Sequence, residues 1–365
     1  MKRKTHFIFE EDLNDPNKLI KINKSKPKLK SKCKSKKQKL IDISPPVNSI
    51  EDLINIGTSK KLYKNIDCNM LANILPVLIE LNDLIGMDEL KSSVFFQVIY
   101  YLQKMHTQNQ NEEYLHTVIM GSPGTGKTSV ARIIGNLYQK LGVLSNKGVF
   151  KIAYRDDFVA EYLGQTAIKT RKLLNSCLGG VLFIDEVYSL GQKEKRDSFS
   201  KEALDTLTAF LSEHKNDFCC IIAGYQKDIE ECFFNTNKGL KRRFPWCHII
   251  KPYNSTDLTK IMLKMIKDMK WETCFQEKDI VAFFTKHKKY FKYYGGDIET
   301  FLTKCKMCHS KRVFSLDHTH KYILNMEDLE SSINMIINSK ENQEKQKDDQ
   351  DDNDNDKPPP FGLYT

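Results

Sequence analysis

Mostly apolar runs of four to six residues alternate along the middle of the chain with longer segments in which apolar residues recur at helical spacing. The short runs lie at 115–120, 149–153, 181–184 and 219–223. Runs of this kind are typical of strands that are buried on both faces of a parallel sheet. Because helical segments separate them, we expect an α/β domain with a doubly wound parallel sheet over residues 84–250.

Helical periodicity dominates on both sides of this α/β region. Residues 49–83 indicate a helical linker that Pro76 interrupts. After residue 250 the pattern becomes wholly helical, which predicts a small helical domain over 251–338. Its helices are expected near 256–270, 278–288, 297–312 and 326–338. Asn325 is a candidate N-cap of the last helix, with Asp328 at its third position.

Charge is concentrated at the two ends of the 365-residue chain, whose net charge is +10. Residues 1–48 include ten lysines between positions 21 and 39. Residues 339–365 hold eight acidic side chains and end in a proline-rich stretch with two aromatic residues. Segments of this composition bury too little apolar surface to fold, so we expect two disordered tails around one folded unit.

The tails leave several interpretations open. The lysines at 21–39 could bind nucleic acid or an acidic partner, or serve as a nuclear-import signal. They could equally form a solvated tail without a dedicated partner. The proline-rich end could be a docking peptide, although such an end is more often only a tail.

Composition excludes two classes of protein. No run of about 18 apolar residues is present, so we expect no membrane-spanning helix and no membrane partner. The N-terminus lacks the apolar core of a secretory signal, and ten cysteines are scattered without a disulfide framework. We therefore expect reduced thiols and a cytoplasmic or nuclear location. The frequent Lys, Asn and Ile would suit an AT-rich genome, such as that of a large DNA virus, which would place the protein in the host cytoplasm.

The stretch from Gly121 to Thr128 has the spacing Gly-x4-Gly-Lys-Thr of a complete phosphate-binding loop, between a predicted strand and a predicted helix. Its glycines let backbone N–H groups turn toward phosphates, and the helix N-terminus favours negative charge. Lys127 can reach the β- and γ-phosphates, and the Thr128 hydroxyl is a candidate Mg²⁺ ligand. The expected nucleotide site comprises Gly121, Ser122, Pro123, Gly124, Thr125, Gly126, Lys127 and Thr128.

A second candidate site follows the apolar run 181–184, which ends in Asp185 and Glu186. Alone, such a pair more often marks a strand end that meets solvent. Because the chain also contains the phosphate-binding loop at 121–128, a catalytic role for this acidic pair is favoured. Asp185 would bind Mg²⁺ or its water, and Glu186 would take a proton from, or orient, the water that attacks the γ-phosphate.

Further stretches make the chain resemble the AAA+ ATPases, and among them the CbxX/CfxQ group, which includes red-type rubisco activases and stage V sporulation protein K-like ATPases. The matching stretches besides the phosphate-binding loop are 84–87, 157–167, 185–190, 202–207, 222–225 and 237–244. The resemblance covers about residues 84–310 and neither tail. It implies an AAA+ core with a helical lid, ATP and Mg²⁺ as cofactors, and nucleotide contacts from Ile85 and Gly86.

The resemblance also implies contacts with a substrate and with neighbouring subunits. Tyr162, Leu163 and Gly164 match the pore loop with which such rings grip a polypeptide, although Tyr162 could instead be buried beneath the loop. Arg243, with Arg242 beside it, matches the arginine finger that reaches a neighbour's γ-phosphate. The alternative is a basic helix end that faces solvent. A finger that acts between subunits requires head-to-tail contacts, and the family implies a homohexameric ring.

The chain departs from the family pattern in two places, and one further motif is ambiguous. Tyr225 stands where many AAA+ proteins have a polar first-sensor residue, and Glu299 stands where the lid has its second-sensor arginine. Residues 305–309 formally match a haem-attachment motif, and with His318 and His320 they form a conceivable zinc set. The spacing fits no common zinc site, so buried thiols are the favoured interpretation.

Together these features predict a ring-forming ATPase that couples ATP hydrolysis to remodelling or threading of a protein substrate. Two other classes remain open at this stage. One is a nucleic-acid motor or loader that uses the lysines at 21–39. The other is an ATP-gated assembly scaffold that hydrolyses little ATP.

Overall fold

The computed structural model describes residues 40–59, 61–107, 113–145, 148–162, 164–191 and 198–339. The lysine-rich segment at 21–39 and the acidic, proline-rich end lie outside these residues. The N-terminal tail was expected to extend to residue 48. Folded structure begins earlier, because Leu40–Ile41 (β1) pairs in parallel with Leu62–Tyr63 (β2).

A five-stranded parallel sheet lies at the centre of the fold, with the strand order β4-β5-β6-β3-β7. Its strands are Thr117–Gly121 (β3), Phe150–Ala153 (β4), Val181–Ile184 (β5), Cys219–Gly224 (β6) and Trp246–Ile250 (β7). The first four agree with the apolar runs of the sequence. The fifth was not predicted, because polar and apolar residues mix in it. The order confirms a doubly wound sheet and places β6 between the two strands that lead into the candidate site.

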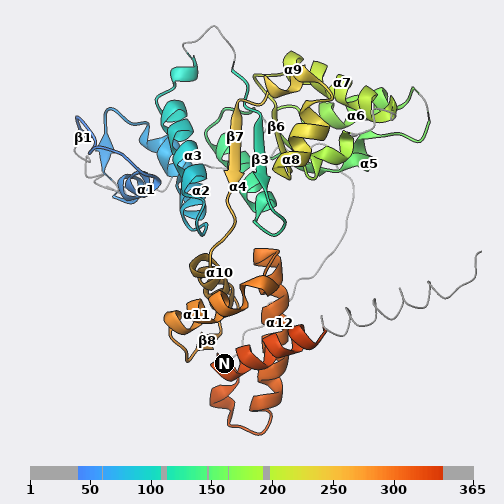
Figure 1. Ribbon diagram of the computed structural model, residues 1–365. Coiled ribbons are helices and arrows are strands. Elements are labelled where there is room, and N and C mark those ends of the chain that lie inside the picture. Colours follow the sequence, from blue (N-terminus) through green and yellow to red (C-terminus); the bar gives the residue numbers. More distant parts are fainter. Residues whose placement is uncertain are drawn as a thin grey trace, which may run out of the picture. The chain divides into compact units, whose positions relative to one another are not determined.

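Successive side chains of each central strand enter two different hydrophobic cores, which explains why these strands are apolar throughout. Phe183 and Ile221 contribute to the core on one face, whereas Leu182 and Ile222 contribute to the core on the other. In Figure 1, helices α1–α3 lie on one side of β3 and β7, and helices α5–α9 lie on the other. Each face of the sheet is thus covered by helices.

The N-terminal helices are part of the first core rather than a separate linker. They are Ile50–Thr58 (α1), Cys68–Asn82 (α2) and Asp88–Leu102 (α3), and they pack with Lys127–Lys140 (α4). Ser49 and Asp52 form a capping box that starts α1. Pro76 was expected to interrupt the second helix, but α2 runs through it. The neighbours Ile74, Val77 and Leu78 are fully buried, and their packing offsets the lost backbone hydrogen bond.

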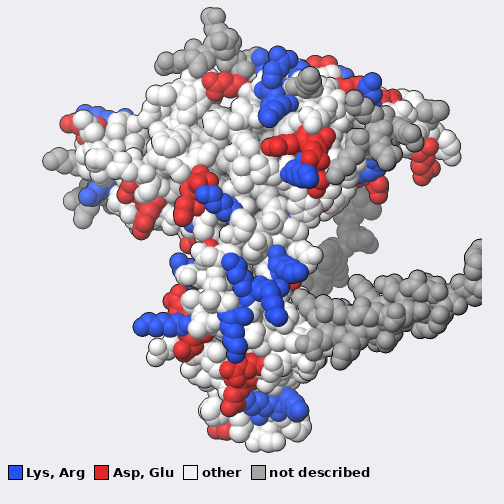
Figure 2. All heavy atoms as spheres, in the orientation of Figure 1, with Lys and Arg blue, Asp and Glu red and all other residues white. Residues whose placement is uncertain are grey.

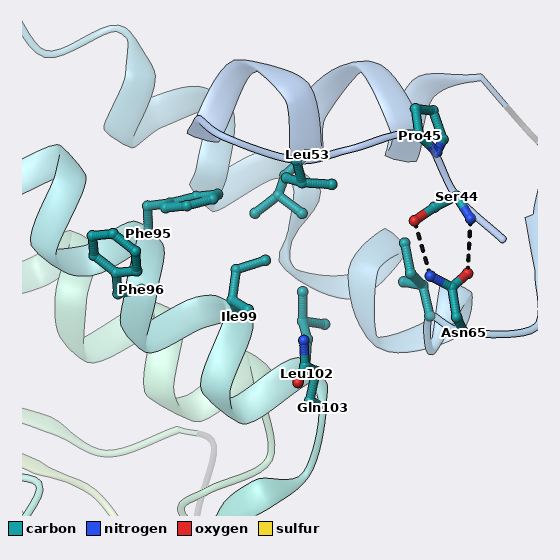
Figure 3. Close-up of a pocket in the computed structure, with 11 residues that line it drawn as sticks. Ser44, Pro45, Leu53, Asn65, Phe95, Phe96, Ile99, Leu102 and Gln103 are labelled. Carbon is teal, nitrogen blue, oxygen red and sulfur yellow. Dashed lines mark hydrogen bonds between the residues drawn. The ribbon is translucent and has the colours of Figure 1, made fainter.

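A cavity of about 430 Å³ opens beside these helices (Figure 3). Leu53 of α1 and Phe95 and Ile99 of α3 form its apolar wall. At one end, the Asn65 side chain accepts a hydrogen bond from the Ser44 N–H and donates one to the Ser44 hydroxyl, each over 3.0 Å.

The second face of the sheet is covered by a group of shorter helices. They are Arg155–Phe158 (α5), Thr166–Asn175 (α6), Ser198–Glu213 (α7), Gln226–Asp228 (α8), the π-helical turn Ile229–Phe234 and Lys238–Lys241 (α9). Leu204, Leu207 and Leu211 of α7 are fully or almost fully buried in this core, at the helical spacing seen in the sequence.

The expected helical domain follows β7 and has its own core. Its elements are Ser255–Asp268 (α10), Glu272–Thr273 (β8), Glu277–His287 (α11), Tyr294–Val313 (α12), Ile323–Leu324 (β9) and a helix over 326–339. Asn325 caps the last helix as predicted, because its side chain accepts the Asp328 N–H over 3.0 Å. Figure 2 shows basic and acidic side chains intermingled over this domain.

His309 of the ambiguous motif belongs to a buried polar network. Its Nδ1 lies 3.0 Å from Asp328 Oδ2, and its Nε2 lies 3.0 Å from the Lys321 carbonyl oxygen. Arg312 also donates two hydrogen bonds to Asp328. Burial alone would raise the pKa of Asp328, but hydrogen bonds from Arg312, Asn325 and His309 outweigh it and hold that pKa below its usual value. Both ring nitrogens of His309 therefore have protein partners, which fits a structural role.

Candidate functional site

The phosphate-binding loop connects β3 to α4 in a conformation that requires its glycines. Gly124 and Gly126 have φ angles of +71° and +86°, in the left-handed region that side chains disfavour. A Cβ on Gly121 would lie 2.9 Å from Thr125 Oγ1, which leaves no room for a side chain. This tightly wound turn, which leads into the N-terminus of α4, is a suitable cradle for phosphates.

Lys127 is the first residue of α4, and only 8% of it is exposed. Its ammonium group donates hydrogen bonds to the carbonyl oxygens of Gly121 and Ser122, over 3.1 and 3.2 Å. The same group lies 5.1 Å from the centre of the Tyr225 ring. Burial lowers the pKa of Lys127, and the nearby Glu186 and Asp185 oppose that shift. The ammonium is thus held at the loop by neutral partners.

Thr128, in the first turn of α4, and Asp185, directly after β5, lie close together. The Thr128 hydroxyl lies 3.3 Å from Asp185 Oδ2, although the two residues are far apart in sequence. Asp185 Oδ1 accepts the N–H of Glu186 over 3.0 Å, which fixes the carboxylate. A hydroxyl and a carboxylate that converge in this way are ligands suited to Mg²⁺, so the donor set fits the expected ion.

Glu186 directly follows Asp185 in a strained backbone conformation. Its φ angle is +49°, which is uncommon for a residue other than glycine. Its Oε2 atom is buried and has no hydrogen-bond partner among the described residues. A buried carboxylate oxygen without a partner can accept a proton from water that enters the site.

Sequence reasoning did not identify Tyr188 as part of this site. Tyr188 lies in the 3-10 turn Val187–Leu190, and its ring stacks on that of Tyr225 with centroids 5.5 Å apart. A Cβ on Gly224 would lie 2.9 Å from Tyr188 Cδ1, so this glycine makes the stacking possible. No spacing rule in the sequence signals this contact, because it joins residues from two different strand ends.

The helical domain contributes two contacts to the loop that the sequence also did not reveal. The Tyr253 hydroxyl donates a hydrogen bond to the Thr125 carbonyl over 3.0 Å. The Gly295 N–H, at the start of α12, donates to the Gly124 carbonyl over 3.1 Å. Gly86, expected at the nucleotide, has a φ angle of +66° and lies beside Tyr253. Ile85 directly precedes Gly86. Glu299, which stands at the expected second-sensor position, is exposed on α12.

The two candidate finger residues differ in their surroundings. Arg243 is half-buried, and its guanidinium donates to Ser212 Oγ over 2.7 Å and to the Gly239 carbonyl over 2.6 Å. Arg242 is exposed and makes no hydrogen bond or ion pair with the described part of the chain. Within one chain, Arg243 is therefore held against α7, while Arg242 is free to project outward.

Of the candidate pore loop, Tyr162 and Gly164 are described and Leu163 is not. Tyr162 is 67% exposed, so the alternative in which it is buried beneath the loop does not hold. Gly164 has a φ angle of +78°, and a Cβ there would meet nothing within 4 Å. The loop thus presents an aromatic ring to its surroundings. Among the helices of the described residues, none is long and apolar enough to cross a membrane.

Comparison with known proteins agrees with this geometry. Residues 117–234 match the model of the ATPase family associated with various cellular activities (AAA). A cfxQ-like protein of Acanthamoeba polyphaga mimivirus is 38% identical over 277 residues, which cover 74% of this chain and 68% of that protein. Stage V sporulation protein K of Bacillus subtilis is 41% identical over 197 residues, which cover 53% of this chain and 60% of that protein.

A solved structure supports the fold alone, because its sequence identity is only 16%. It is the FIGL-1 AAA domain in complex with ADP, which matches with a TM-score of 0.52 over 69% of this chain and 82% of that chain. The fold and the similarity to known proteins lead to the same family. The features that agree are the parallel sheet, the phosphate-binding loop, the acidic pair after β5 and the extent of the sequence similarity. This chain belongs to the CbxX/CfxQ-type AAA+ ATPases, which bind and hydrolyse ATP.

Proposed function

We propose that this chain forms a ring, most simply a homohexamer, that couples ATP hydrolysis to the remodelling or threading of a protein substrate. The observation that carries this proposal is the exposure of Tyr162 beside Gly164. An exposed aromatic ring on a short turn can grip a polypeptide without regard to its sequence. The same turn matches the pore loop of the family.

The residues of the site divide the chemistry between them. The loop from Gly121 to Gly126 and Lys127 would bind the phosphates, and Thr128 and Asp185 would hold Mg²⁺. A bound Mg²⁺ ion neutralises the charge that develops on the transferred phosphoryl group. Glu186 would orient the attacking water and take its proton, and its unpartnered Oε2 atom is available for this task.

The arginines after α9 would complete the site of the next subunit. A guanidinium is always charged and presents several donors, so it suits the γ-phosphate during transfer. For Arg243 to act in this way, its guanidinium must leave Ser212 and the Gly239 carbonyl. Such a contact between subunits is head-to-tail and closes into a ring.

The two alternative functions receive less support. A nucleic-acid motor or loader would use the lysines at 21–39. The face drawn in Figure 2 shows acidic and basic side chains intermingled rather than a continuous basic stripe. An ATP-gated scaffold would not need Glu186 in its strained position. The relative from a virus of amoebae supports a location in the host cytoplasm.

A substitution in the candidate pore loop tests the proposal. We expect Tyr162→Ala to keep basal ATPase activity but to lose stimulation by an unfolded model polypeptide such as casein. Tyr154, which is 54% exposed, offers the matched control, and Tyr154→Ala should behave like wild type. Full stimulation of Tyr162→Ala would contradict threading. Stimulation by single-stranded DNA, lost when residues 1–39 are deleted, would favour the nucleic-acid alternative.

A further inference from the structure

Two stacked tyrosines lie near the lysine of the phosphate-binding loop, on the turns that follow β5 and β6. Tyr225 directly follows β6, and β6 lies between β5 and β3 in the sheet. Tyr225 therefore follows a strand that lies between β5, which precedes Glu186, and β3, which leads toward Lys127. Tyr188 stacks on Tyr225 with an interplanar angle of 26°. Of the two rings, that of Tyr225 lies next to the Lys127 ammonium, with its centre 5.1 Å away.

On the lysine side, every direct contact is with a neutral group. The Lys127 ammonium is held by two backbone carbonyls and lies 5.1 Å from the Tyr225 ring centre. The carboxylates of Asp185 and Glu186 are near enough to raise the pKa of Lys127 against the effect of burial. Even so, no ion pair joins Lys127 to either carboxylate in the residues that the structure describes.

On the glutamate side, the carboxylate is similarly left without a cation. Glu186 Oε2 is buried and has no partner within the described chain. Burial raises the pKa of Tyr188, and the nearby Glu186 carboxylate raises it further. Gly224 provides the space for the stacked ring, because a Cβ there would lie 2.9 Å from Tyr188 Cδ1.

We propose that Tyr188 and Tyr225 form an aromatic partition that keeps the Lys127 ammonium from pairing with the Glu186 carboxylate before ATP binds. A direct ion pair at the buried Lys127 ammonium would occupy both groups that the reaction needs. A tyrosine ring is a weaker partner for an ammonium, and phosphate oxygens can displace it. Tyr225 is thus a positioning residue for Lys127, and Tyr188 is a positioning residue for Glu186.

The partition rests on the ATP site of the proposed function but not on ring formation or threading. Its test is therefore ATP affinity, measured by isothermal titration calorimetry on the full chain. In Tyr225→Leu the ring is lost, and Lys127 can pair with Glu186. We expect ATP to bind about tenfold more weakly, since phosphate must now break an ion pair. Tyr225→Phe retains the ring and should bind ATP within about twofold of wild type.

The decisive measurement adds Glu186→Gln to Tyr225→Leu. A glutamine cannot form the ion pair, so the partition predicts that the double variant regains ATP affinity to within about twofold of Glu186→Gln alone. An equal loss of affinity in both backgrounds would overturn the partition, as would unchanged affinity in Tyr225→Leu. If Tyr225→Leu does not fold, Tyr188→Leu tests the other half of the partition with the same rescue. Normal ATP binding without polypeptide stimulation would contradict the threading function while leaving the partition intact.

Discussion

The Gly295 N–H lies 3.1 Å from the carbonyl oxygen of Gly124 and joins the helical domain directly to the phosphate-binding loop. Gly295 stands at the start of α12, and the Tyr253 hydroxyl makes a second contact of this kind with Thr125. These contacts bear on the role of the exposed Glu299, which stands where the family resemblance leads us to expect a second-sensor arginine. In this chain, backbone and hydroxyl groups at the loop are available to link nucleotide binding to the lid.

The first prediction uses a pair of adjacent glycines. A Cβ on Gly295 would lie 3.1 Å from the Gly124 carbonyl oxygen, whereas a Cβ on Gly296 would meet nothing within 4 Å. We expect Gly295→Ala to push α12 away from the loop and to weaken ADP binding by about threefold to tenfold, which corresponds to the loss of roughly one hydrogen bond. Gly296→Ala, with the same gain in helix propensity, should bind ADP normally. Equal affinities of the two variants in calorimetry would contradict this link.

The second prediction separates binding from turnover. Lys127→Ala should abolish tight ATP binding, because the phosphates lose their ammonium partner. Glu186→Gln should retain binding and lose hydrolysis, since an amide cannot accept the proton. Calorimetry with ATP and a phosphate-release assay measure the two effects. Normal turnover of Glu186→Gln would show that another group activates the water, and unchanged affinity of Lys127→Ala would refute the nucleotide site.

The third prediction concerns the contact between subunits. We expect Arg243→Ala to bind ATP nearly normally, because its own loop is intact, and to lose hydrolysis by about 10³–10⁵ if the arginine acts as a finger. Mixing Arg243→Ala with Lys127→Ala subunits should restore part of the activity, since an intact loop then meets an intact finger. Arg242→Ala, which removes the adjacent and exposed arginine, is the matched control. If Arg242→Ala rather than Arg243→Ala loses hydrolysis and regains it on mixing with Lys127→Ala, then Arg242 is the finger. If neither variant regains hydrolysis in rings proven to be mixed, neither arginine acts as a finger between subunits.

The fourth prediction is a loss of stability in mild acid. His116 is fully buried, and burial lowers its pKa to about 3. Above the unfolded value of about 6.5, neither state binds this proton. As the pH falls from about 6.5 toward 3, the unfolded chain gains a proton that the folded chain cannot, so the free energy of unfolding decreases. We expect a loss of the order of 3 kcal/mol by pH 4.

Urea unfolding between pH 7 and pH 4 measures this loss. His248 should add to it, because burial lowers its pKa to about 4. The variant His116→Leu removes one of these titrating groups, so its stability should depend less steeply on pH. An unchanged slope in that variant would mean that His116 does not contribute to acid unfolding.

The sequence by itself determined the local chemistry of the site. The spacing of Gly121, Lys127 and Thr128 requires a loop between a strand and a helix. Strands β3, β5 and β6 were visible because both of their faces are buried, and the edge strand β4 was visible because all its residues except Lys151 are apolar. The acidic pair Asp185 and Glu186 was visible because it directly follows the apolar run of β5. These features depend on residues that are close in sequence, where periodicity and motif spacing carry the information.

The tertiary structure alone decided the features that depend on distant residues. β7 mixes polar and apolar residues and forms a strand because it pairs with β3. The helix through Pro76 persists because its neighbours are buried in a shared core, a gain that no local propensity records. The stacking of Tyr188 on Tyr225, beside Lys127, depends on the strand order, which places β6 between β5 and β3. Strand order is set by packing over the whole domain, so only the folded chain could show which side chains meet at the site.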